Sequence, residues 1–407
     1  MDKESTGTGS AFSTRKKIPL FELVVSLVLS FSVSRKKKCL ADAYRLFIEL
    51  TGKVISRSSF WDRLANKKLL EFLEKAVLQF SFKLQEKALL KLSWLSLFTD
   101  VFIYDSSPIR LPNALANIFP GNRTNHSPAC LKLSALYQLS VRGVQWIKLT
   151  AQKPHDNQVL PSLEQLKGAL FLFDLGYFSH VFLHNLNEIG VWFVCRLKAN
   201  SSPIISRVVK GVSKKFIGHQ LNDRISLRGP IVEAWGYLKL PGGKLLEVRI
   251  IGFRFPKTKQ YRWYVTNLAS SMVLAEWIYP IYRLRWQIEL FFKSIKSLLN
   301  TDQITSGNET IALAVIYSSI LGSLIASSII IEDSLVLANI ELRSITAQRL
   351  MIVFSLVAHN LAHCIISKNI SYKSMFLKLK ILSPLLVCPN RKHRPTSLER
   401  VIMLPNT

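Results

Sequence analysis

Two short runs of apolar residues, each followed at once by an aspartate, constrain the fold of this chain most. Residues 101–104 and 170–173 have the length and composition of buried strands, and Asp105 and Asp174 come directly after them. Segments of the same texture follow: strand-like 192–197 and 261–267, and helix-like 178–189. Alternating strands and helices predict an α/β fold, in which the strand ends present reactive groups along one edge of the sheet.

The local pattern of apolar, polar and turn-forming residues divides the chain into five predicted regions. They are a helical region over 1–95, the first part of an α/β core over 96–199, a β-rich insertion over 200–260, the second part of the core over 261–305, and a helical, basic region over 306–407. Serines in the segment 55–60 predict a helix N-cap. Two helices joined there by a short polar turn suit a small DNA-binding module, or equally a plain helical packing domain.

The charge of the chain points to a polyanionic partner. Lys and Arg number 54 against 26 Asp and Glu, a formal net charge of +28. Nucleic acid is the first expectation and an acidic membrane surface the second. An apolar content of 49% excludes disorder as the main state, and five widely spaced cysteines exclude a disulfide scaffold. We expect a reduced, cytoplasmic protein associated with DNA.

One segment raises the alternative of a basic membrane protein. Residues 311–331 carry no charge and are long enough to span a bilayer. They nevertheless contain several serines and Gly322, which is typical of a helix packed inside protein. Residues 18–33 are also apolar, but Glu22 interrupts them and no signal-cleavage site follows. The sequence therefore favours a buried core helix and no membrane partner.

The segment after Pro280 predicts a long helix with its charges on one side. At about 100° per residue, one stripe carries Tyr282, Arg285, Glu289, Lys293 and Lys296. The opposite face is apolar: Leu284, Ile288, Phe291, Ile295 and Leu299. A solvated face of ion pairs would give a similar pattern. In a chain with few acids, however, a single carboxylate among cations indicates a functional face.

Asp105, Asp174 and Glu289 together are the donors that a divalent-metal phosphodiester site needs. Hard oxygen ligands suit Mg²⁺ or Mn²⁺, and two such ions can act on the attacking and the leaving oxygen. Neighbouring Arg and Lys side chains would neutralise phosphates. Taken singly, each aspartate is more often a turn former or a helix cap.

The spacing Tyr282-x2-Arg285-x3-Glu289-x6-Lys296 resembles the Y-R-E-K signature of insertion-sequence transposases of the DDE class, in the family named after insertion sequence four. Four further stretches resemble blocks of that family in the same order: YDSSPIRLP at 104–112, DLGY at 174–177, CRLK at 195–198 and YVTNL at 264–268. The resemblance covers about residues 55–330.

This resemblance implies an RNase H-like catalytic core interrupted by the β-rich insertion. It implies that Asp105, Asp174 and Glu289 form the metal-binding triad, and that Tyr282, Arg285 and Lys296 hold DNA phosphates; Lys293 lies on the same stripe. Family members also stack a tryptophan on a flipped base. Trp263 is the nearest candidate here, although it is offset by about one residue, and Trp286 is expected to be a packing residue.

The implied function is that of a DNA transposase. It would bind terminal inverted repeats, cleave and transfer strands in a cut-and-paste reaction with a hairpin step, and act as a dimer on two DNA ends. A metal-dependent nuclease without strand transfer and a non-catalytic DNA-binding relative are the alternatives. His359 and His363 are spaced as two metal ligands on one helix would be. The segment lacks the Glu of an H-E-x-x-H motif, so we expect a structural helix there. His155-Asp156 is expected to have a loop role.

Overall fold

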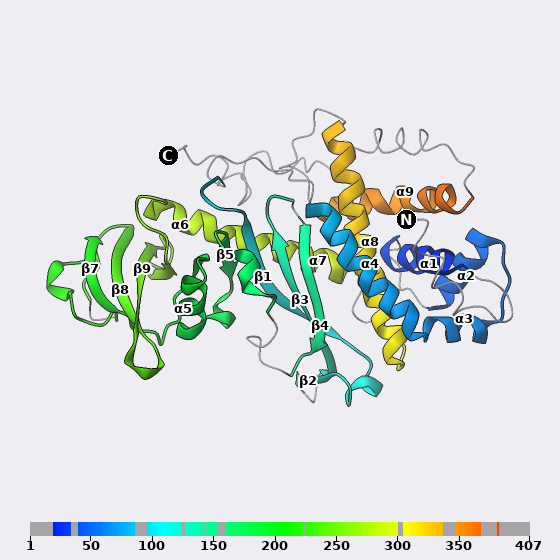
Figure 1. Ribbon diagram of the computed structural model, residues 1–407, viewed down its shortest axis with the longest axis horizontal. Coiled ribbons are helices and arrows are strands. Elements are labelled where there is room, and N and C mark those ends of the chain that lie inside the picture. Colours follow the sequence, from blue (N-terminus) through cyan, green and yellow to red (C-terminus); the bar gives the residue numbers. More distant parts are fainter. Residues whose placement is uncertain are drawn as a thin grey trace.

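A computed structural model of the chain describes residues 19–33, 40–85, 96–123, 127–141, 143–153, 160–222, 225–299, 304–336, 347–367 and 381. The molecule is elongated, with a large sheet in its middle, most helices gathered at one end and the strands β7–β9 at the other (Figure 1). The basic run 35–38, the pair His155-Asp156 and most of the basic C-terminal tail lie outside the described residues.

Ten strands of the described chain form one sheet. Its order is β2-β3-β1-β5-β6-β10-β9-β8-β7, and β4 pairs with β3 on the side away from β1. The strands are β1 Val101–Arg110, β2 Pro120–Arg123, β3 Ser127–Gln138, β4 Gly143–Ala151, β5 Leu170–Phe173, β6 Trp192–Arg196, β7 Ile204–Lys210, β8 Ile231–Lys239, β9 Leu245–Arg254 and β10 Tyr261–Thr266. A mixed α/β fold with a central sheet is thus confirmed.

The centre of the sheet is parallel and its flanks are antiparallel. β5 pairs parallel with both β1 and β6, whereas β3 pairs antiparallel with β1 and β4. The sequence predicted that the first strand ends at Asp105, but it continues to Arg110. The reason is that β5 pairs only with 101–104, while β3 pairs with β1 along its length from Phe102 to Arg110.

The residues of the predicted insertion continue the same sheet. β7, β8 and β9 form an antiparallel meander, and β9 pairs with β10, which in turn pairs with β6. A buried ion pair lies within this meander: Arg249 on β9 binds Glu233 on β8, with 2.8 Å between Nε and Oε1. Arg249 also donates to the carbonyl of Val273 at 2.6 Å.

The described helices are α1 Leu20–Val33, α2 Leu40–Thr51, α3 Arg57–Leu64, α4 Lys67–Gln85, α5 His180–Glu188, α6 Ala275–Tyr282, α7 Trp286–Leu299, α8 Glu309–Val336 and α9 Ala347–Ser367. Ser56 caps α3 and accepts a hydrogen bond from the Ser59 amide at 3.1 Å, as the serine cluster predicted. Between β4 and β5 the chain forms a 3₁₀ turn over Leu163–Leu166.

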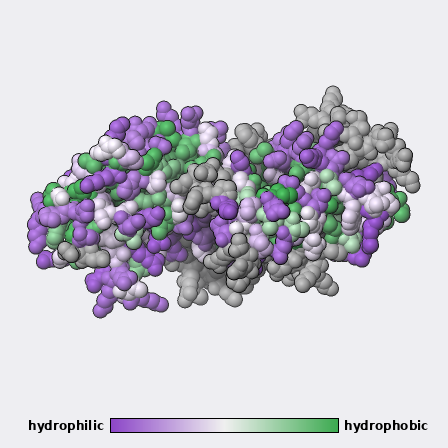
Figure 2. All heavy atoms as spheres, turned by 90° about the horizontal axis from the view of Figure 1, so that it is seen from below, coloured by the Kyte–Doolittle hydropathy of each residue, from purple (hydrophilic) through white to green (hydrophobic). Residues whose placement is uncertain are grey.

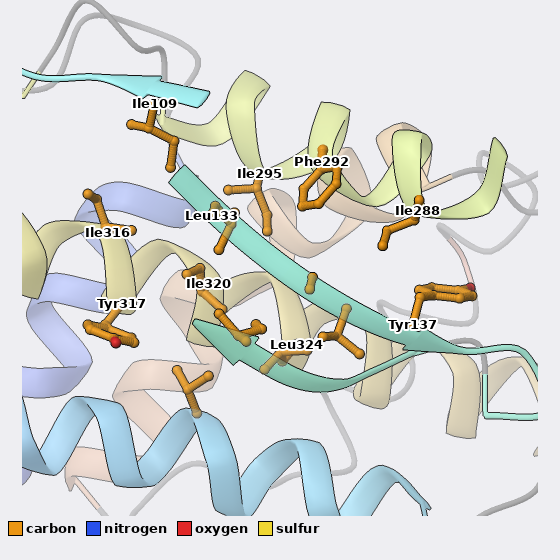
Figure 3. Packing of buried hydrophobic residues seen from close by; sticks show 14 of the residues in the cluster. Ile109, Leu133, Tyr137, Ile288, Phe292, Ile295, Ile316, Tyr317, Ile320 and Leu324 are labelled. Atoms are coloured by element: carbon orange, nitrogen blue, oxygen red, sulfur yellow. The ribbon is translucent and has the colours of Figure 1, made fainter. Parts of the chain in front are cut away.

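Apolar cores cover both faces of the sheet. α5 packs on one face against Tyr104, Phe171 and Phe173. α7 and α8 contribute to the core on the other face, and Figure 3 shows Ile288, Phe292 and Ile295 of α7 and Ile316, Ile320 and Leu324 of α8 gathered around β3. Phe292, rather than the predicted Phe291, is the buried phenylalanine of α7.

The uncharged segment lies in α8. This is the one described helix that is long and apolar enough to cross a membrane, yet 78% of its window Glu309–Ala326 is buried inside the protein. α8 packs against α1, α4, α7 and α9. The sequence-based expectation of a buried core helix agrees with this burial. The face of the molecule in Figure 2 mixes hydrophilic and hydrophobic residues along its length.

Candidate active site

Asp105 and Asp174 are neighbours at the edge where β1 and β5 stop pairing. The parallel register places Tyr104 opposite Phe173, so the two aspartates are the next residues on adjacent strands, about 4.8 Å apart at the backbone. Tyr104 and Phe173 both point into the core under α5. Because successive side chains alternate between faces, both carboxylates point toward the face that carries α7.

Glu289 reaches this edge from the first turn of α7. The sequence predicted one helix after Pro280, but Pro280 lies inside α6, and a 3₁₀ turn over Arg283–Arg285 separates α6 from α7. Pro280 has no N–H with which to bond the carbonyl four residues earlier, which weakens a regular helix in this region. Leu284 and Ile288 remain fully buried and anchor the turn to the core.

Arg285 lies at the centre of the three carboxylates. One of its terminal nitrogens is 2.9 Å from Oδ2 of Asp105, the other contacts Oε1 of Glu289, and Nε is 3.9 Å from Oδ1 of Asp174. Only 15% of the Arg285 side chain is exposed, so its charge is balanced within the protein. Three acids distant in sequence therefore converge on one cation.

Tyr282 contacts the same group from the end of α6. Its hydroxyl donates to Oδ1 of Asp174 at 3.4 Å, a long hydrogen bond, and its ring packs 5.1 Å from that of Tyr264. Burial raises the pKa of the Tyr282 phenol well above its usual value. Tyr282 therefore keeps its proton and acts as a hydrogen-bond donor at neutral pH.

Sequence reasoning did not single out two side chains next to Asp105. The Ser106 amide donates to Oδ1 of Asp105 at 2.8 Å, and the Tyr177 hydroxyl donates to the Ser106 hydroxyl at 2.9 Å. Both residues lie inside stretches quoted above for the family resemblance, YDSSPIRLP and DLGY. Their position next to the two aspartates was the available signal, but the contact between them needs the folded sheet.

The lysines and the tryptophan of the predicted site lie apart from this cluster. Lys293 is exposed on α7, and Lys296 is partly buried one turn later, where burial lowers its pKa. Trp263 stacks on Tyr261 with ring centroids 5.8 Å apart and lies over Gly252, where an added Cβ would come within 2.7 Å of its ring. Its neighbours belong to the core on the α5 side, so its stacking on a base stays a prediction.

The donor set fits a hard divalent cation. Three carboxylates, with side chains 18%, 44% and 30% exposed, surround a point that already attracts positive charge from Arg285. Carboxylate oxygens are the ligands that Mg²⁺ and Mn²⁺ prefer, and no described cysteine or histidine contacts these acids.

The family model of the transposase DDE domain matches residues 96–315, which include all three acids. The chain belongs to this family. DDE transposases act on DNA and use divalent metal ions, in agreement with the chain's charge and its carboxylate cluster.

Curated transposases of insertion-sequence elements resemble the chain over much of its length. The transposase of the element IS1151 from Clostridium perfringens is 23% identical over 325 residues, 70% of this chain and 68% of its own length. That of IS231E from Bacillus thuringiensis subsp. finitimus is 28% identical over 261 residues, 53% of each chain. The chain thus spans about half to two thirds of the length of these relatives.

The chain also aligns with a solved structure. The cryo-EM structure of a piggyBac transposase synaptic complex with hairpin DNA aligns with 95% of this chain and 82% of its own chain. The TM-score is 0.45 and the identity 10%.

Asp105 should make the stability of this DDE transposase depend on pH when metal is absent. Burial is the largest cause and raises the pKa of Asp105 to about 6, against the lowering effects of the Ser106 amide and Arg285. The folded carboxyl keeps a proton that the unfolded chain releases between about pH 4 and 6, so stability is lost as the pH rises through this window. We expect a loss of about 3 kcal/mol.

Urea unfolding in the presence of a chelator measures this loss. The side chain of Asp105→Asn cannot titrate. The free energy of unfolding of this variant should therefore rise relative to that of the unaltered protein between about pH 4 and 7. A difference between the two proteins that stays constant over this range contradicts the prediction.

Proposed function

We propose that this chain binds the terminal inverted repeats of its own mobile element and catalyses metal-dependent strand cleavage and strand transfer. The observation that carries the proposal is the convergence of Asp105, Asp174 and Glu289 on one point within a DDE domain. We infer that the strands β4-β3-β1-β5-β6 form an RNase H-like core, because three antiparallel strands are followed in space by two parallel ones, with acids on β1, after β5 and on α7.

The three carboxylates would hold Mg²⁺, with Mn²⁺ as a substitute, and two ions in the working complex. When bound, such ions polarise the phosphate and stabilise charge on the attacking and leaving oxygens. The fold supplies the positioning: the sheet register fixes the two aspartates, and the buried face of α7 fixes Glu289.

Arg285 would exchange its carboxylate partners for a DNA phosphate when metal ions bind. Without metal, its guanidinium neutralises the three acids. Metal ions would take over that task, which frees Arg285 to bind a DNA phosphate, the contact that the family signature implies. Tyr282 and Lys296 would position the backbone beside it, and Trp263 would stack on a flipped base.

DNA binding would extend beyond the catalytic edge. The helical region over 1–95 and the basic residues at both ends of the chain would hold duplex DNA near the site, which agrees with a net charge of +28. Two copies would pair two transposon ends in a synaptic homodimer. We place the protein in the cytoplasm, associated with DNA.

A cleavage assay on DNA that carries the ends of the element tests the proposal. The ends are identified as imperfect inverted repeats flanking the gene and bracketed by short direct repeats. We expect no products in a chelator, and cleaved and joined products with Mg²⁺ or Mn²⁺. Cleavage without joining would show that the chain is a metal-dependent nuclease. End binding without cleavage would show that it is a non-catalytic DNA-binding relative. Products formed in the chelator would contradict the metal role.

Lys293 offers a test of the phosphate contacts alone. Its side chain is exposed on α7, on the same helix as Glu289, and contacts none of the acids. Lys293→Ala should weaken binding to all duplexes alike and reduce the slope of log K against log salt by about 1. Lys167→Ala is the matched control, because Lys167 is exposed just before β5, at the opposite end of that strand from Asp174. Equal slopes for the two variants would remove Lys293 from the interface.

A further inference from the structure

A second group of metal-ligating side chains lies where the N-terminal and C-terminal helices meet. Glu49 on α2 and His359 and His363 on α9 each offer one ligand atom, and these atoms all lie within 4.8 Å of one another. Nε2 of His359 is 3.3 Å from Oε1 of Glu49, and the two imidazole rings are 4.8 Å apart. This group is separate from the three carboxylates in both sequence and chemistry.

The packing of α2 on α9 fixes the backbone that carries these side chains. α2 and α9 pack on each other, and the small core beneath them includes Leu50 of α2 with Phe354, Ala358 and Ala362 of α9. His359 and His363 are four residues apart, so they project from the same face of α9 on successive turns. The backbone on which each ligand stands is therefore fixed by burial, while the side-chain ends remain reachable from solvent: 43% of His359 and 59% of Glu49 are exposed.

The ligand types select a different metal from that of the acid cluster. Two imidazole nitrogens and one carboxylate oxygen suit Zn²⁺, which binds such atoms at about 2.0–2.2 Å in a tetrahedron whose corners are about 3.4 Å apart. The 3.3 Å between Glu49 and His359 already matches that spacing. The ligand atom of His363 lies within 4.8 Å of the other two, so a rotation of its side chain would bring it to the same spacing. Mg²⁺ disfavours imidazole, so the two sites would sort their metals by ligand chemistry.

We propose that Glu49, His359 and His363 form a zinc site that joins α2 to α9. The motif on α9 lacks the glutamate of H-E-x-x-H, and the fold supplies a carboxylate from a helix more than 300 residues earlier in the chain. Water completes the coordination. The bound ion would fasten the N-terminal helical region to the C-terminal one and stabilise the folded state.

Metal titration of the full-length protein tests this site. After removal of metal, Co²⁺ is added as a spectroscopic probe and Zn²⁺ as the competing ion. We expect a tetrahedral Co²⁺ absorption that Zn²⁺ displaces, and resistance to urea that rises with Zn²⁺, about 100-fold in the unfolding equilibrium at 100 times Kd. His359→Gln, His363→Gln and Glu49→Gln should each weaken Zn²⁺ binding, the two histidine variants by at least about 100-fold.

The controls separate this site from other histidines and from the acid cluster. His184→Gln removes a comparable exposed pair, because His184 lies 3.8 Å from Glu188 on one turn of α5, and it should leave the titration unchanged. Asp105→Asn, at the separate acid cluster, should leave the tetrahedral Co²⁺ absorption unchanged. Equal Zn²⁺ affinity in the unaltered protein and in His359→Gln/His363→Gln would overturn the proposal, and so would an octahedral Co²⁺ spectrum that no variant alters.

Discussion

Glu289→Gln should lower strand cleavage at transposon ends by at least about 10³-fold and leave end binding within about threefold. Gln has nearly the same shape as Glu, so α7 keeps its packing through Ile288 and Phe292. The change removes one of three anionic ligands, and it leaves Arg285 with the two aspartates as partners. Single-turnover cleavage with Mg²⁺ and a binding titration on the same DNA separate the two effects.

Glu276→Gln is the matched control for that experiment. Glu276 lies on α6, in the segment that leads to the site, and pairs at the surface with Lys210 at 2.8 Å. Both partners are about half exposed, so the loss of this pair should cost little. Full cleavage by Glu289→Gln, or an equal loss of cleavage in both variants, would remove Glu289 from the catalytic group.

Arg249→Ala should lower the free energy of unfolding by about 3–5 kcal/mol. The Arg249 side chain is fully buried and that of Glu233 is 7% exposed, so neither charge can be solvated after its partner is lost. Arg249 also donates to the Val273 carbonyl, and Ser270 donates to Glu233 at 2.8 Å. The variant would thus leave the buried Glu233 carboxylate without a cation, and the Val273 carbonyl before α6 without this donor.

A double variant keeps this prediction testable if the single variant does not fold. Arg249→Met with Glu233→Leu replaces both charges by apolar groups of similar size, which is often neutral or stabilising. Urea unfolding should therefore place the double variant above Arg249→Ala by several kcal/mol. A single variant within about 1 kcal/mol of the unaltered protein would show that the pair contributes little.

Much of the candidate site could be predicted because its residues follow strong local patterns. Residues 101–104 and 170–173 are continuous apolar runs, so the strands and the acids that follow them were visible in the sequence. The spacing from Tyr282 to Lys296 was equally visible, although the helix is interrupted by a 3₁₀ turn. Which phenylalanine of α7 is buried depends on packing against β3 and α8, and the periodicity named the wrong one.

The sequence by itself determined the class of the protein: an α/β chain with a strongly basic balance, three well-placed acids and a motif order that resembles DDE transposases. Local composition and spacing suffice for this, because strands, helices and motifs are properties of neighbouring residues. Only the tertiary structure decided which distant groups meet. Sheet register brings Asp105 beside Asp174, and the 3₁₀ turn before α7 directs the Arg285 side chain toward the three acids. The packing of α2 on α9 brings Glu49 close to two histidines. These contacts join residues 69 to more than 300 positions apart, and no local pattern encodes such a distance.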